Sequence, residues 1–148
     1  MEKRILTKIS NKSLSFIDTS FAIALINERD ENHEKAVELS IKYERKPILT
    51  TDAVLLEIGN SLARNFKEQS ITLIEKLLMT EETEIVRLDE TLFDRAFDLY
   101  KSHTDKTWGL VDCISFVVMR ERGITNALTS DKHFVQAGFR ALMLDLEN

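Results

Sequence analysis

The chain has 148 residues, 43% of them hydrophobic and 30% charged, which is typical of one globular domain, and its 4 Gly and 1 Pro argue against a linker-rich or disordered chain. The net charge of −5 does not favour a basic nucleic-acid-binding surface, although a carboxylate site for divalent cations would also make a protein acidic. No apolar run approaches the roughly 18 residues of a membrane span, the start lacks the apolar core of a secretory signal, and the single Cys113 suits a reducing compartment, so we expect a cytoplasmic protein.

Short β-like runs alternate with helical periodicity along the whole chain. In the first half we expect strands over residues 15–17, 48–50 and 84–88, and helices over residues 21–27, 32–45, 51–65 and 68–79. Thr51 or Asp52 caps the third of these helices, and we assign Asp52 to capping alone. In the second half we expect helices over 90–101, 109–121 and 131–137, strands over 127–129 and 141–144, and a polar loop over 102–107.

Strands separated by helices require crossover connections, so the pattern predicts an α/β fold with a parallel sheet and helices on both faces. About five strands are expected, in a three-layer α/β/α sandwich. Ligands of such sheets bind beyond the carboxyl ends of the strands, near the point where the strand order reverses. The polar residues that follow the strands are therefore the first candidates for a site.

Four acids are predicted at that edge. Asp18 directly follows the first strand and Asp131 the fourth, Asp112 lies in the first turn of the helix that begins at residue 109, and Glu57 lies in the helix after the second strand. Gathered carboxylates suit a hard divalent cation, and Mg²⁺ and Mn²⁺ prefer oxygen ligands. Such a site can activate water and stabilise the leaving oxygen of a phosphodiester.

Each acid also has a simpler interpretation. Asp18 and Asp131 are good helix caps, Asp112 could complement a helix dipole, and Glu57 could pair with Arg64 on a solvated face. The remaining candidates for chemistry are weaker. No metal-ligand spacing links the histidines His33, His103 and His133, although His133 could lie near the rim. We expect Cys113 and Trp108 to have packing roles.

Four motifs that follow one another along the chain favour the metal site over these simpler interpretations. They are IDTS, LLEIGNSLAR, GLVDCISFVVMRERG and ALTSDKHFVQAGF. Together they resemble the PIN-domain family, specifically the VapC-like ribonucleases, over residues 14–144. The resemblance implies an α/β/α sandwich that cleaves RNA with Mg²⁺ or Mn²⁺. It implies residues 13–148 as the PIN domain, preceded by a basic extension over residues 1–12 that is either a disordered tail, which we favour, or an arm contacting RNA.

The same resemblance assigns roles to residues of this chain. Asp18 and Asp112 look like the core metal ligands, Glu57 like the helix-borne acid, and Asp131 like an acid acting directly or through water. Ser20 and Ser130 resemble hydroxyl residues that orient ligands or water, and Asn60 and Asp105 are further supporting candidates. The basic residues nearest the predicted rim, and so candidates for RNA binding, are Arg64, Lys67, Lys106, Lys132 and His133.

We therefore expect a metal-dependent endoribonuclease, the toxin of a VapBC-type toxin–antitoxin pair, with RNA as substrate, a small antitoxin as partner, a homodimeric state and no membrane association. The alternative from the same resemblance is a catalytically silent PIN-like module that binds RNA or protein. A receiver-type signalling domain fits less well, because Asp18 has no adjacent acid and no Lys follows the last strand. A dinucleotide-binding domain would need a glycine fingerprint that the chain lacks.

Overall fold

The structure is a computed structural model, and it describes residues 14–145. The predicted extension over residues 1–12 lies outside this range. The described elements, in chain order, are β1 (Ser15–Ile17), α2 (Thr19–Ile26), α3 (His33–Lys42), β2 (Ile48–Thr51), α4 (Asp52–Leu62), α5 (Lys67–Met79), β3 (Thr83–Val86), α6 (Glu90–Ser102), α7 (Leu110–Arg122), β4 (Asn126–Leu128), α8 (Lys132–Gln136), β5 (Arg140–Ala141) and the 3₁₀ helix η2 (Leu142–Leu144).

The five strands form one parallel sheet with the order β3-β2-β1-β4-β5. The chain places β2 and β3 on one side of β1, then crosses over to add β4 and β5 on the other side. The strand order therefore reverses between β1 and β4, and the crevice at their carboxyl ends is where an open α/β sheet binds its ligand.

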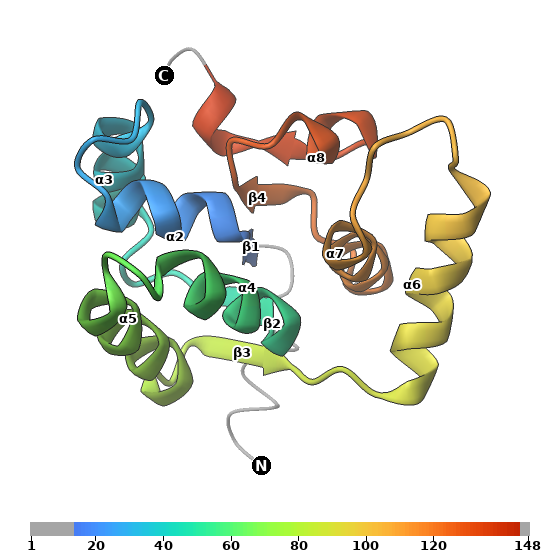
Figure 1. Ribbon diagram of the computed structural model, residues 1–148, viewed down its shortest axis with the longest axis horizontal. Coiled ribbons are helices and arrows are strands. Elements are labelled where there is room, and N and C mark those ends of the chain that lie inside the picture. The colour runs from blue at the N-terminus through green and yellow to red at the C-terminus, as the bar shows by residue number, and fades with distance from the viewer. Residues whose placement is uncertain (1–13, 146–148) are drawn as a thin grey trace.

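Helices cover both sides of this sheet, which confirms the predicted α/β/α sandwich. Helices α2, α3, α4 and α5 pack in series on one side, and α6 packs along α7 on the other (Figure 1). All three residues of β1 are buried, as are all four of β2, as expected for central strands with helices on both faces. Among residues 14–145, no helix is long and apolar enough to cross a membrane.

An aromatic cluster fixes α7 and α8 against the sheet. Phe116 of α7 meets Phe134 of α8 edge to face with ring centroids 5.0 Å apart, and Phe134 lies 6.3 Å from Phe16 of β1. Trp108 packs edge to face on Phe116 at 5.0 Å, which agrees with its predicted packing role. The neighbouring Cys113 is fully buried, and burial raises the pKa of its thiol to about 11, so it behaves as a small apolar residue.

Two predictions about local structure are wrong. The last strand, expected over 141–144, ends at Ala141 and continues as a 3₁₀ helix. Its partner β4 continues only one residue beyond the pair of Ala127 with Ala141, so a strand over 141–144 would run past the end of β4.

The second correction concerns the start of α4. Thr51 is the N-cap and accepts a hydrogen bond from the amide of Val54 at 3.1 Å. Asp52 is instead the first helical residue, and its carboxylate accepts the amide of Leu88 at 3.0 Å. Thr51 therefore takes the capping role at the start of α4, and Asp52 ties this helix to the segment that follows β3.

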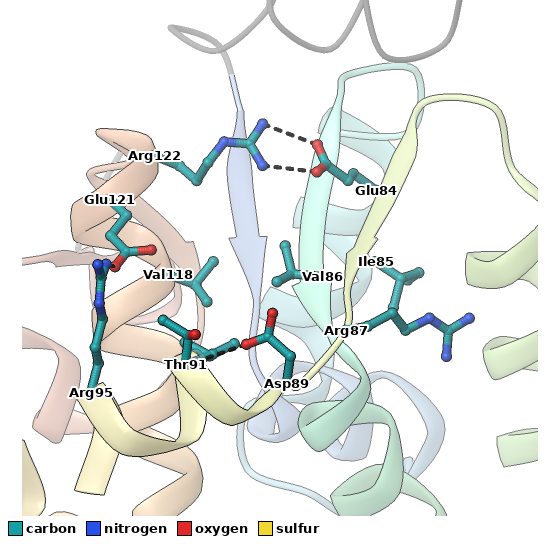
Figure 2. A pocket seen from close by; sticks show the side chains of 11 residues that line it. Glu84, Ile85, Val86, Arg87, Asp89, Thr91, Arg95, Val118, Glu121 and Arg122 are labelled. Atoms are coloured by element: carbon teal, nitrogen blue, oxygen red, sulfur yellow. Dashed lines mark hydrogen bonds and ion pairs between the residues drawn. The ribbon is translucent and has the colours of Figure 1, made fainter. Parts of the chain in front are cut away.

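Ion pairs join the far end of α7 to its neighbours. Arg122 donates two hydrogen bonds to the carboxylate of Glu84 on β3, at 2.9 and 3.0 Å, and Arg95 of α6 pairs with Glu121 (Figure 2). These four side chains border a pocket of about 430 Å³ between β3, α6 and α7. None of the four predicted acids lines this pocket, so it is separate from the predicted site.

Candidate active site

Asp18 occupies the centre of the crevice at the carboxyl end of β1. Its side chain caps α2, accepting the amide of Ser20 at 3.5 Å, while its own amide donates to the carbonyl of Leu128 at the end of β4. Only 5% of the residue is exposed. Burial raises the pKa of its carboxyl to about 6, and the negative charge of Asp112 contributes to the increase. The predicted cap role and a place in an acidic site therefore both hold for Asp18.

Hydroxyl groups surround one oxygen of this carboxylate. Thr129 donates to Oδ2 of Asp18 at 2.7 Å, and Ser20 Oγ lies 3.1 Å from the same oxygen. The two hydroxyls are 3.0 Å apart; Ser20 Oγ accepts the amide of Ser130 and Thr129 Oγ1 accepts the amide of Asp131, both at 3.0 Å. This network holds the segment after β4 against the segment after β1, and so fixes the positions of the first and last acids relative to each other.

Asp112 and Asp131 meet across the crevice. Asp112 lies in the first turn of α7, where its Oδ2 accepts the amide of Gly109 at 3.0 Å, and Asp131 caps α8 by accepting the amide of His133 at 2.9 Å. The ring Nδ1 of His133 lies 3.0 Å from Oδ2 of Asp112 and 3.3 Å from Oδ1 of Asp131. Burial, together with the charge of Asp131, raises the pKa of Asp112 above its ordinary value, although the amide of Gly109 opposes the increase.

Glu57 approaches the site through a neighbour of Asp18. Its Oε1 accepts a hydrogen bond of 2.5 Å from the hydroxyl of Thr19, which is itself buried. The predicted alternative, a surface pair with Arg64, is not what the structure contains: Glu57 faces Thr19, and Arg64 is exposed. The contact connects α4 to the start of α2, one residue from Asp18.

The other predicted site residues are less closely engaged. Ser130 contributes its amide to the network, whereas Asn60 is exposed on α4 and Asp105 is exposed in the loop before α7, where it pairs with Lys106 at 3.6 Å. Arg64, Lys67 and Lys132 are exposed at helix ends. Among the candidates for RNA binding, His133 alone has a side chain that contacts the acids.

Three threonines in this region escaped the sequence analysis. Thr19 binds Glu57, Thr129 binds Asp18, and the hydroxyl of Thr107 lies 3.0 Å from Nε2 of His133. The position of Thr129, directly after β4, was a usable signal, because residues that end parallel strands reach the same edge. No sequence signal identified Thr19 or Thr107, whose partners come from other elements.

The donor set fits a hard divalent cation. One potential ligand atom from each of Asp112, Asp131 and His133 lies within 4.8 Å of the others. Asp18 adds a buried carboxylate whose pKa rises partly because of the nearby charge of Asp112. A bound cation would offset this repulsion.

Fold and site together define an α/β/α protein with a carboxylate-rich site at the switch point of its parallel sheet. Residues 15–140 match the PIN domain family. The chain is 31% identical over 126 residues to the 23S rRNA-specific endonuclease VapC20 of Mycobacterium tuberculosis, covering 84% of this chain and 94% of that protein.

Solved structures agree. The crystal structure of M. tuberculosis VapC20, described as a sarcin-ricin loop cleaving toxin, superposes with a TM-score of 0.75 and 30% identity over 86% of this chain and 96% of that chain. VapBC2 of Rickettsia felis, bound to a promoter DNA fragment, shares the fold at a TM-score of 0.60 and 16% identity, with the same coverage.

The chain therefore belongs to the PIN-domain family, as its four motifs predicted. The homology to VapC20 supports an endonuclease, and so confirms the predicted class of activity.

Proposed function

We propose that the chain is a Mg²⁺- or Mn²⁺-dependent endoribonuclease whose site consists of Asp18, Glu57, Asp112 and Asp131. The observation that carries this proposal is the gathering of acids at the switch point: Asp112 and Asp131 present oxygens within 4.8 Å of each other, and the buried Asp18 is near enough for the charge of Asp112 to contribute to its raised pKa. A divalent cation would offset the repulsion between such neighbouring carboxylates. VapC20, whose alignment with this chain spans most of both proteins, is named as an rRNA-specific endonuclease.

Asp18 and Asp112 would hold the cation, with Asp131 beside them and Glu57 at the margin. A bound divalent cation would supply Lewis-acid chemistry, polarising water and the phosphodiester. The chain's own contribution is positional. Thr129 and Ser20 both bind Oδ2 of Asp18, so the orientation of this carboxylate is set before any ligand arrives.

RNA would approach the exposed side of this crevice. The cations closest to the acids in sequence, Lys106 before α7 and Lys132 at the start of α8, are exposed and flank Asp112 and Asp131. We propose that they contact phosphates, with Arg64 and Lys67 farther along the same path. A structured ribosomal RNA segment is the first substrate to test, because it is the substrate named for VapC20.

The test compares purified wild-type protein with Asp18→Asn on the same RNA in Mn²⁺ or Mg²⁺, with EDTA as a further control. We expect cleavage by the wild type that EDTA abolishes and that Asp18→Asn lacks. Asp94→Asn, which removes an exposed acid on α6, is the matched variant and should cleave normally. Equal cleavage by wild type and Asp18→Asn would reveal a contaminating nuclease and remove the basis of the proposal.

The silent-module alternative makes a different prediction for metal binding. A module that only binds RNA or protein has no use for a cation at the acids, so calorimetry with Mn²⁺ should detect no site that Asp18→Asn removes. The endonuclease homology favours the enzyme over the module.

We also propose that the chain acts as a toxin with a small antitoxin partner in the cytoplasm. An apolar pocket of about 110 Å³, lined in part by Phe21 and Leu25 of α2 and Leu73 of α5, offers a place for a partner's apolar side chain. Co-purification with the product of an adjacent small reading frame, and inhibition of RNA cleavage by it, would test this partnership. Failure of the co-expressed product to bind would contradict it.

A homodimer is the last part of the proposal. Phe93, Phe97 and Tyr100 form a stripe along α6, the aromatic stripe, with successive ring centroids 6.1 and 6.3 Å apart. Each is 40% exposed or more, and adjacent exposed aromatic side chains are a feature of protein–protein interfaces. We propose that two copies associate through it.

A further inference from the structure

The side chain of His133 joins three separate segments at the site. Its Nδ1 faces Asp112 of α7 at 3.0 Å and the cap residue Asp131 at 3.3 Å, and its Nε2 faces the hydroxyl of Thr107 at 3.0 Å. The ring is about three-quarters buried, with 26% of the side chain exposed. Both nitrogens are therefore used within the protein.

The chemistry of these partners fixes which nitrogen carries the proton. Ionised carboxylates only accept hydrogen bonds, so Nδ1, which faces two of them, must carry a hydrogen. Nε2 then accepts a hydrogen bond from the hydroxyl of Thr107. A neutral ring in this orientation has one donor directed at the acids and one acceptor held by the loop before α7.

We infer that His133 is a positioning residue, which holds Asp112 and Asp131 in the geometry that binds the divalent cation and which is itself oriented by Thr107. The inference rests on the proposed metal-dependent function. It adds a role that the four-acid description of the site does not contain: His133, which lies near enough to both acids to be counted with them as a possible ligand, orients them instead of binding the cation.

The hydrogen bonds around the ring explain how His133 can hold the two acids in place. The backbone amide of His133 also binds Asp131, at 2.9 Å, so one residue contacts this acid twice and Asp112 once. The loop that carries Thr107 is anchored separately, because Trp108 donates from Nε1 to Gln136 of α8 at 2.9 Å. Groups that orient metal-binding carboxylates typically change metal affinity by about 10- to 100-fold when they are removed.

Three variants separate the parts of this arrangement. His133→Phe keeps a planar ring but has no donor, His133→Asn keeps a donor near the position of Nδ1, and Thr107→Val removes only the partner of Nε2. We expect the Mn²⁺ dissociation constant, measured by calorimetry on the full chain, to rise about 10- to 100-fold in His133→Phe. His133→Asn should bind close to wild type, and Thr107→Val should lie between the two.

RNA kinetics and spectroscopy give further readouts. At saturating Mn²⁺, kcat should fall in His133→Phe while KM for RNA stays unchanged. Nitrogen-15 NMR of the metal-free wild type should find the neutral ring protonated on Nδ1, and Thr107→Val should weaken that preference.

Several outcomes would overturn the inference. A raised KM with unchanged Mn²⁺ affinity would make His133 an RNA contact, and nitrogen coupling to bound Mn²⁺ in pulsed EPR would make it a direct ligand. Wild-type affinity in His133→Phe, or failure of His133→Asn to restore it, would exclude a positioning role. If the wild type itself bound no Mn²⁺ and cut no RNA, the proposed function would fall and the inference with it.

Discussion

Two features of Asp18 act on the pKa of its carboxyl group in opposite directions. It is almost fully buried, and it accepts hydrogen bonds from two hydroxyls, so its charged form is both penalised by burial and supported by donors. Burial prevails, and the pKa lies at about 6 instead of 3.8. At a pH near 6, Asp18 is therefore only partly ionised at the position where a cation would bind.

This pKa makes the stability of the metal-free protein depend on pH. Between pH 3.8 and about 6 the folded protein holds a proton that the unfolded chain has lost, so the free energy of unfolding decreases as pH rises through this window. The shift corresponds to at most about 3 kcal/mol. Asp18→Asn removes the cost of ionisation and should raise the melting temperature near neutral pH more than at acidic pH, measured calorimetrically in EDTA. An equal effect at both pH values would contradict this.

The hydroxyl of Thr129 moderates the same pKa. Its hydrogen bond to Asp18 lowers the pKa, so Thr129→Val should raise the pKa of Asp18 further above its ordinary range. A cation must displace the proton, and the midpoint of Mn²⁺ binding against pH should therefore move to higher pH. Thr129→Ser, which keeps the hydroxyl, is the control. An unchanged midpoint in Thr129→Val would mean that the hydrogen bond does not act on the charge of Asp18.

The sequence located residues better than it located their contacts. Asp18, Asp112 and Asp131 could be placed at one edge because each follows a strand or begins a helix, and such positions depend on element order alone. The contacts of Thr19 with Glu57 and of Thr107 with His133 depend on how helices pack and on how one loop folds. Spacing within a single segment carries no information about either contact.

At the scale of elements, local rules succeeded where a residue determines its own backbone. A glycine just beyond a helical pattern commonly ends the helix, and Gly123 ends α7 with φ at 67°, a left-handed conformation that side chains disfavour. The last strand failed because its length depends on where its partner β4 ends. That constraint comes from the assembled sheet.

Two glycines give a matched test of this backbone argument. A Cβ at Gly123 would meet nothing within 4 Å, so Gly123→Ala should destabilise by about 1 kcal/mol through backbone strain alone. Gly59, inside α4, would place its Cβ 3.9 Å from Ile74, an ordinary contact. Gly59→Ala should therefore stabilise by about 0.5–1 kcal/mol. Urea denaturation measures both, and changes of the same sign would contradict the argument.

At the scale of the whole molecule, the aromatic stripe on α6 is the surface through which we expect two copies of the chain to associate. Introducing a charge at the centre of the stripe, by Phe97→Lys, should convert a dimer to a monomer, because burying an unpaired ammonium is costly. Ile71→Lys on α5 alters a residue of similar exposure, 47%, outside the stripe and should leave the dimer intact. Light scattering after size-exclusion chromatography gives the mass, and a monomeric wild type would contradict the proposed dimer.

The hydrogen bond between Thr129 and Asp18 joins residues 111 positions apart, and the central strand β1 has one of its two neighbours, β4, in the same late part of the chain. During synthesis, a ribosome that has made β1, β2 and β3 has produced only one side of the sheet. Asp18 and Ser20 have been made by then, but Thr129 and the acids Asp112 and Asp131 have not. A nascent chain therefore has no complete site until β4 and the residues that follow it have been made.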